Sequence, residues 1–112
     1  MNAAEIKRAY ARELKETIGV RRYTGTGATR PRYDIFIRGK ATPYGATELI
    51  GTITQGDQKV FLLAEDIIAG LMTLPITTND KVVVKGKELS IVNPAERKAP
   101  DGTLVAYEIQ AR

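Results

Sequence analysis

Apolar residues recur at helical spacing in the first part of the chain. The apolar positions are four residues apart: Ile6, Tyr10, Leu14 and Ile18. Asn2 followed three residues later by Glu5 has the form of a capping box, which begins a helix. The pattern predicts an amphipathic helix over residues 1–18. Its apolar stripe is narrow, so the helix either lies on the rest of the domain or binds a partner subunit through Ile6, Tyr10 and Leu14.

Beyond Gly19, apolar and polar residues alternate in short runs, which is typical of half-buried strands. Residues 55–58 and 85–87 contain glycine between two such runs and predict hairpins. Asn93-Pro94 predicts the end of a strand, because proline lacks the N–H that a central strand needs. The runs read as strands are residues 20–24, 33–38, 49–54, 59–63, 81–84, 88–92 and 104–111.

A second, shorter helix is expected over residues 64–71. Glu65 and Asp66 lie in its first turn, where the helix dipole favours acids, and Gly70 and Pro75 indicate where it stops. The predicted fold is therefore α+β and mainly β. It is a small barrel or sandwich of about six antiparallel strands, with an N-terminal helix and a short helix in the middle.

The length of 112 residues is that of a single domain. Within it we expect residues 1–18 to form the helix, which could serve as a partner-binding arm, and residues 19–112 to form the barrel or sandwich. The apolar runs are too short to span a membrane. The N-terminal residues lack the basic and then apolar layout of a signal peptide, which favours a cytosolic protein.

Composition excludes several kinds of chemistry. The chain has no cysteine and no histidine, so disulfides, the usual zinc sites and nucleophiles activated by histidine are excluded. Gly25-Thr26-Gly27 lacks the third glycine and the following helix of a dinucleotide-binding loop. Neighbouring acids at the start of a helix point in different directions, so Glu65 and Asp66 do not form a catalytic pair. We expect no enzymatic activity, no cofactor and no metal.

Positive charge is concentrated near the N-terminus. Residues 1–40 hold ten Lys/Arg against four Asp/Glu, whereas residues 41–112 hold seven against nine. The basic part could face phosphates or an acidic protein surface, or it could simply carry solvated side chains on outer faces. Single-stranded nucleic-acid binders place aromatic side chains on a basic sheet face. The candidate residues for that function are Arg21, Arg22, Tyr23, Phe36 and Arg38.

The C-terminal part of the chain resembles the small neck proteins of tailed phages and prophages. Residues 75–92 (PITTNDKVVVKGKELSIV) follow the order of elements common in these neck proteins: a loop with proline, a turn, a strand, a hairpin with glycine and a second strand. Residues 102–112 (GTLVAYEIQAR) are similar to their final strand, and residues 51–63 (GTITQGDQKVFLL) to their central hairpin. The resemblance covers about residues 48–112, and it departs from the pattern at Asn79, where many relatives have glycine.

The resemblance implies a head–tail joining protein of the stopper or adaptor type. Such proteins form a ring below the portal, seal the DNA-filled head and provide the surface to which the tail docks. The implied partners are other copies of the chain, portal or adaptor proteins and tail proteins, with a monomer possible before assembly. The implied location is the virion, or the host cytoplasm during assembly. Candidate contacts to a partner or, non-specifically, to DNA are Arg21, Arg22, Arg30, Arg32 and Arg38.

Overall fold

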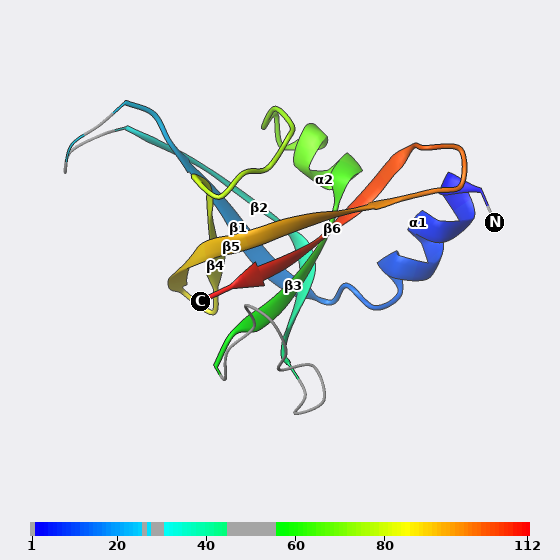
Figure 1. Cartoon of the computed structure of the whole chain (residues 1–112), viewed down its shortest axis with the longest axis horizontal. Coiled ribbons are helices and arrows are strands. Elements are labelled where there is room, and N and C mark those ends of the chain that lie inside the picture. The colour runs from blue at the N-terminus through cyan, green and yellow to red at the C-terminus, as the bar shows by residue number, and fades with distance from the viewer. Residues whose placement is uncertain (1, 26, 28–30, 45–55) are drawn as a thin grey trace.

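The computed structural model describes residues 2–25, 27, 31–44 and 56–112. The described strands form a closed antiparallel barrel in the order β1-β2-β3-β6-β5-β4 (Figure 1). Their bounds are β1 (Glu16–Tyr23), β2 (Arg32–Pro43), β3 (Gln58–Leu63), β4 (Lys81–Val84), β5 (Lys87–Lys98) and β6 (Leu104–Ala111). The helices are α1 (Ala3–Ala11) and α2 (Ala64–Ala69). The predicted class is confirmed, and of its two architectures the chain adopts the barrel.

The strand order joins two sequential meanders, β1-β2-β3 and β4-β5-β6. The first seam between them is β3 with β6, and the second is β1 with β4. The β1–β2 hairpin and the β5–β6 hairpin both extend beyond the barrel, in opposite directions (Figure 1). The helix α1 lies beneath the β5–β6 hairpin, and α2 lies at one end of the barrel.

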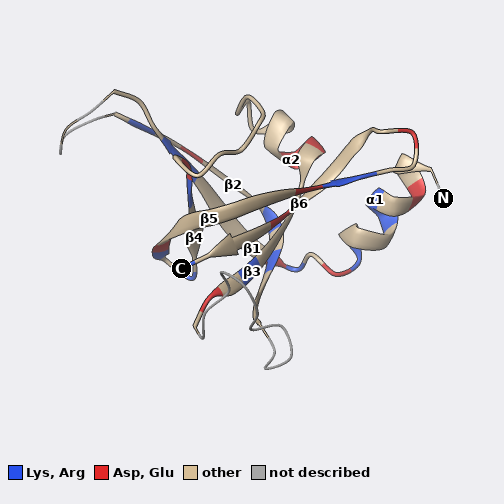
Figure 2. Ribbon diagram, viewed as in Figure 1, with Lys and Arg blue, Asp and Glu red and all other residues tan. Residues whose placement is uncertain are grey.

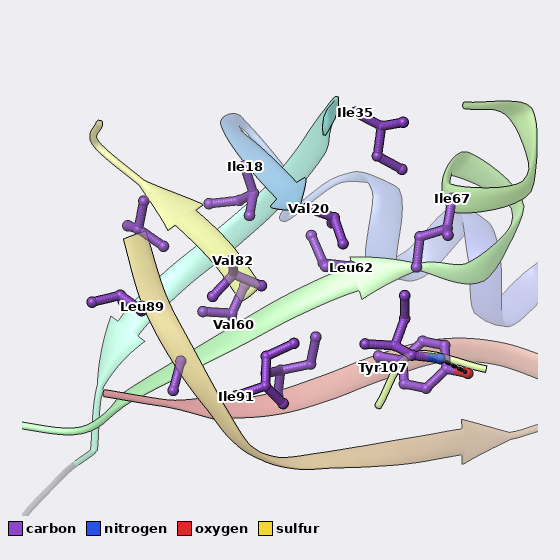
Figure 3. Close-up of a cluster of buried hydrophobic side chains, with 14 of the residues drawn as sticks. Ile18, Val20, Ile35, Val60, Leu62, Ile67, Val82, Leu89, Ile91 and Tyr107 are labelled. Carbon is purple, nitrogen blue, oxygen red and sulfur yellow. Dashed lines mark hydrogen bonds between the residues drawn. The ribbon is translucent and has the colours of Figure 1, made fainter. Parts of the chain in front are cut away.

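Successive side chains of a strand point to opposite faces of the sheet. Every second residue of each strand therefore points into the barrel, and these side chains fill its interior. Ile67 of α2, together with Met72 and Ile76 beyond it, packs onto this interior cluster. Tyr107 is its largest fully buried side chain (Figure 3). The remaining members from the strands are Ile18, Val20, Ile35, Val60, Leu62, Val82, Val84, Leu89, Ile91, Ile109 and Ala111.

Gly39 is the point at which β2 changes neighbours. It pairs with Glu16 of β1 on one side and with Leu62 of β3 on the other. A Cβ atom added there would lie 2.6 Å from Cγ1 of Ile18 and 2.9 Å from the carbonyl oxygen of Phe61. Only glycine therefore allows the strands to approach so closely at this corner of the barrel.

The hairpin predicted around residues 85–87 is confirmed. Lys85 (φ 53°) and Gly86 (φ 80°) both have positive φ. Two consecutive residues of this kind form the type I′ turn whose twist matches the flanking strands. The predicted short helix is also confirmed, although α2 ends at Ala69 rather than at residue 71.

The prediction of a helix over residues 1–18 is wrong beyond Ala11. Asn2 caps α1 as expected, its side chain accepting a hydrogen bond from the backbone N–H of Glu5. The helix stops at Arg12, and β1 begins at Glu16. Ile18 is 1% exposed and belongs to the barrel interior. The β-branched residues Thr17, Ile18 and Val20 fit a strand better than a helix, and pairing with β2 and β4 decides the outcome.

The prediction that a strand ends at Asn93-Pro94 is also wrong. Strand β5 continues to Lys98, and its register with β6 shifts between Ile91 and Asn93. Pairing with β4 ends at Ser90, so Pro94 lies next to a bulge in the part of β5 that has left β4. Bulges and edges are the places where strands tolerate proline.

The strand predicted at residues 49–54, with part of its hairpin, lies outside the described residues. Strand β3 instead pairs with β2 and β6. No helix in the described part of the chain is long and apolar enough to cross a membrane.

Candidate interaction surface

The outer face of β2, β1, β4 and β5 carries side chains in rows set by the strand register. The first row is Asp34, Arg21, Lys81 and Ser90. The second row is Phe36, Gly19, Val83 and Glu88. These positions alternate with the residues that fill the barrel, so they face outward. Phe36, one of the candidate residues for nucleic-acid binding, therefore lies on an outer sheet face.

Phe36 lies against Gly19 and remains open to solvent. It is 65% exposed. A Cβ atom at Gly19 would lie 3.2 Å from a carbon of the Phe36 ring. The ring therefore occupies the space that glycine leaves on the neighbouring strand, as aromatic residues do across from strand glycines. Its other side borders a shallow hollow that Arg38, Asp66, Ala69 and Gly70 also line.

All large hydrophobic side chains that are exposed in the described part of the chain lie on β2 or at α2. Leu71, directly after α2, is 83% exposed and has a φ of 64°. A positive φ costs free energy in a residue other than glycine. The hydroxyl of Tyr33 donates a hydrogen bond to the carbonyl oxygen of Gly70, which ties β2 to the end of α2. Tyr33 alternates with Phe36 along β2 and so lies on the opposite face of that strand. We call the other three side chains the Phe36 surface: Phe36, Ile68 and Leu71.

Arg21 is held by two carboxylates on the same outer face. Its Nε and Nη2 atoms donate to the two oxygens of Asp34 at 3.0 and 3.1 Å. Its Nη1 atom donates to Oε1 of Glu88 at 3.2 Å, and the hydroxyl of Tyr23 donates to the same oxygen at 2.6 Å. These bonds, above all those that Arg21 donates to Asp34, raise the pKa of Arg21 above its ordinary value. The arginine braces β1 against its neighbours.

Arg22 is directed to the loop that follows α2. Its Nε and Nη2 atoms donate to Asp80 at 2.8 and 3.0 Å, and its Nη1 atom donates to the carbonyl oxygen of Thr73 at 2.8 Å. The carboxylate of Asp80 is 4% exposed and also accepts from the backbone N–H of Thr77. The ion pair with Asp80 raises the pKa of Arg22. It also holds the loop that follows α2 against β1.

The remaining predicted arginines differ in exposure. Arg38 donates to Asp66 at 2.8 Å and lies 3.5 Å from Glu65, with 46% of its side chain exposed. Arg32 lies 3.6 Å from Asp34, with 54% of its side chain exposed. Arg30 lies outside the described residues. Arg32 and Arg38 thus lie beside acids, and Figure 2 shows Lys and Arg interspersed with Asp and Glu on α1 and on the described strands.

The helix face predicted to bind a partner packs on the barrel of its own chain. Leu14 is buried, and Ile6 and Tyr10 pack against a second apolar cluster. The ring centroids of Tyr10 and Phe61 lie 4.8 Å apart. The buried residues of this cluster are Leu14, Leu63, Ala99, Val105 and Ala106.

The buried acids of the described residues are neutralised by arginine. Asp57 accepts hydrogen bonds from Arg112 at 2.9 and 3.0 Å and from Gln110 at 2.9 Å, and Asp80 is held by Arg22. These ion pairs connect residues outside the strands to β1 and to the C-terminal residue. Within the part of the chain that the structure describes, no group of three or more acidic, histidine or cysteine residues could hold a metal ion.

Glu88 on the outer face makes the free energy of unfolding depend on pH. Hydrogen bonds from Tyr23 and Arg21 lower the pKa of Glu88 below its ordinary value of 4.5. A lowered pKa in the folded protein contributes stability that is present above the ordinary value and is lost as the pH falls through the lowered one. We therefore expect Glu88→Gln to lose less stability than the natural protein between about pH 7 and about pH 3.

Urea unfolding at a series of pH values measures this difference. It should be small, because 38% of the Glu88 side chain is exposed. Tyr23→Phe, which removes the largest cause of the pKa shift, should reduce the pH dependence in the same direction. Equal acid sensitivity of the natural protein and both variants would contradict the assignment.

Comparison with known families and curated proteins found no match to this chain. Its function is therefore inferred from the residues and their arrangement.

Proposed function

We propose that the protein is a structural component of a tailed phage or prophage, which joins head and tail by forming a ring at the neck below the portal. The similarity of about residues 48–112 to neck proteins supports this proposal. The observation that carries it is the Phe36 surface. Exposed apolar side chains gathered on adjoining elements are typical of a protein–protein contact.

The charges around the Phe36 surface favour a protein partner. Arg38 is balanced by Asp66, and Arg21 by Asp34. An apolar centre with paired charges around it resembles the core and rim of a protein interface. A ring places its copies head to tail, so each copy needs two different complementary faces. The Phe36 surface supplies one of them.

We expect Leu71→Asp and Phe36→Asp to block joining without unfolding the barrel, because both side chains are mostly exposed. The measurement is negative-stain microscopy of lysates from the phage that carries the gene, with the gene deleted and supplied again as each variant. Separate tails beside heads without tails are expected from the deletion and from both variants. Thr103→Asp, at the exposed turn between β5 and β6, is the matched control and should restore virions. Intact virions from the deletion would contradict the proposed function.

A second candidate function, binding of single-stranded nucleic acid, is supported by the position of Phe36. Its ring lies on an outer sheet face with Arg21 and Lys81 in the adjacent row, where a base could stack. Arg21 and Arg22 are already paired, with Asp34 and Glu88 and with Asp80, so Lys81 is the cation that this function would use.

Fluorescence anisotropy with a labelled oligonucleotide tests this second function. If it is correct, the free protein binds at physiological salt, and Phe36→Ala weakens binding by about 1–3 kcal/mol. A neck protein should be nearly indifferent to the oligonucleotide under the same conditions, and absence of binding would exclude the second function.

A further inference from the structure

The helix α1 covers an apolar site on the outside of the barrel. Leu63 of β3 and Ala106 of β6 are fully buried there, although they sit at positions that alternate with the barrel interior. The partly buried side chains that pack against this site from α1 are Ala3, Ile6, Tyr10 and Ala11. We call the site the α1 seat: Phe61, Leu63, Ala99, Val105 and Ala106.

Among the described residues, side chains make the contact between α1 and its seat. None of the residues of α1 is buried. The backbone hydrogen bonds around it are local, from Ile6 to Asn2 and from Glu13 to Tyr10. Two ion pairs connect this region to the barrel and α2, Lys7 with Glu65 at 3.6 Å and Glu13 with Lys40 at 3.4 Å, and both are substantially exposed. Exposed pairs of this kind contribute little stability.

Open space flanks the contact at Tyr10. A cleft of about 340 Å³ lies on the side of Leu14 and Lys59, and another of about 320 Å³ lies on the side of Ile6 and Lys98. Protein interiors are close-packed, and clefts along a contact leave its side chains with fewer neighbours. The contact between α1 and the barrel is therefore loosely packed at Tyr10.

The connection between α1 and β1 can act as a hinge. Arg12, Glu13 and Lys15 are exposed, whereas Leu14 remains anchored in the apolar cluster. A helix of nine residues is about 14 Å long, and opening at Arg12 would carry it away from its own barrel. The seat would then expose Leu63, Val105 and Ala106, so an empty seat is unfavourable.

We propose that α1 exchanges between copies of the chain, each copy placing its α1 on the seat of the next. The exchange fills every seat with the same contacts that the structure shows within one chain, so the two states differ little in packing. It also adds to each copy one donating and one receiving face beside the Phe36 surface, and head-to-tail rings are built from such unlike faces. The proposal rests on the proposed function, because it supplies the contact between neighbours in the ring.

Crosslinking between cysteine variants tests the exchange, because the natural chain has no cysteine. Ala9 and Lys98 line the same cleft, one on α1 and one on the β5–β6 hairpin. Chains carrying only Ala9→Cys are mixed with chains carrying only Lys98→Cys, equilibrated at concentrations from micromolar to millimolar, and treated with a short bismaleimide. A crosslink between the two kinds of chain is expected. Thr78→Cys, exposed in the loop before β4, replaces Lys98→Cys as the control and should give none.

Shortening the hinge provides a second measurement. Deleting Arg12 and Glu13 prevents α1 from reaching its own seat, so light scattering should show a shift from monomer to larger species. A chain that stays monomeric with this deletion, and a mixture that gives no crosslink between chains, would overturn the exchange. Oligomers that form without the crosslink would overturn the exchange alone and leave ring assembly through another face. Failure of the proposed function is read separately, from intact virions after gene deletion.

Discussion

Replacing Arg22 with leucine is expected to lower the free energy of unfolding by about 3–5 kcal/mol. The guanidinium neutralises Asp80, whose side chain is 4% exposed. Without it, the backbone N–H of Thr77 is the one hydrogen-bond donor that the described residues leave to the buried carboxylate. The loop after α2 would also lose the hydrogen bonds that Arg22 donates to the carbonyl oxygens of Thr73 and Pro75. Since domains of this size have only about 5–15 kcal/mol of stability, the variant should unfold at much lower urea concentration.

Arg38→Leu is the matched control for this prediction. It breaks an ion pair of similar geometry with Asp66, but 46% of the Arg38 side chain is exposed. We expect a loss of at most about 1 kcal/mol. The double variant Arg22→Leu with Asp80→Leu should recover part of the lost stability, because it removes the uncompensated charge. Equal losses for the Arg22 and Arg38 variants would contradict the structural role of the buried pair.

The second large effect is expected at Gly39. Gly39→Ala should cost about 1–3 kcal/mol, because overpacked cores must shift their side chains or backbone. The added methyl group would lie 2.6 Å from Ile18, 2.8 Å from Leu62 and 2.9 Å from the carbonyl oxygen of Phe61. The backbone oxygen belongs to the β3 ladder and cannot rotate away. Urea or thermal unfolding measures the loss.

Gly19→Ala is the comparison for Gly39→Ala. There the new methyl group meets Val83 at 3.0 Å and the exposed ring of Phe36 at 3.2 Å. The ring can swing outward, so the destabilisation should be smaller than at Gly39. A larger loss at Gly19 would contradict the view that β2 must bend closely past its neighbours at Gly39.

The barrel could be predicted from the sequence where pattern and local turn chemistry agree. The alternation at residues 81–84 and 88–92, with a glycine turn between them, predicts the β4–β5 hairpin correctly. The start of α1 is equally local, because Asn2 and Glu5 alone form its cap. These elements depend on residues that are neighbours in the chain.

The errors arise where distant partners decide the structure. Leu14 and Ile18 continue the spacing of a helix, but Ile18 pairs with Val84 of β4 and joins the barrel interior. Strand β5 runs through Pro94 because β6 pairs with it on both sides of a bulge. Neither partner can be recognised from residues near Ile18 or Pro94.

The candidate site was predicted only in part, for the same reason. Alternation along β2 places Phe36 outside, but nothing in the sequence indicates that it lies over Gly19. The salt-bridge partners of the arginines were not predicted, because Asp80 is 58 positions from Arg22 and Glu88 is 67 positions from Arg21. Nothing in the sequence indicates that Leu71 is exposed, since an apolar residue at the end of a short helix is ordinarily buried.

The two seams of the barrel set the order in which the molecule can fold. The β1–β2, β4–β5 and β5–β6 pairings join neighbouring strands, whereas β1 must find β4 across the whole first meander. That pairing joins only Ile18–Arg21 with Lys81–Val84, so few hydrogen bonds form between the two strands. Closing the long loop between them costs conformational entropy, which these few bonds must offset. Contacts between residues so far apart in sequence slow folding. The barrel should therefore close last at this seam, after both meanders have formed, and the Arg22–Asp80 pair beside it should form in the same late step.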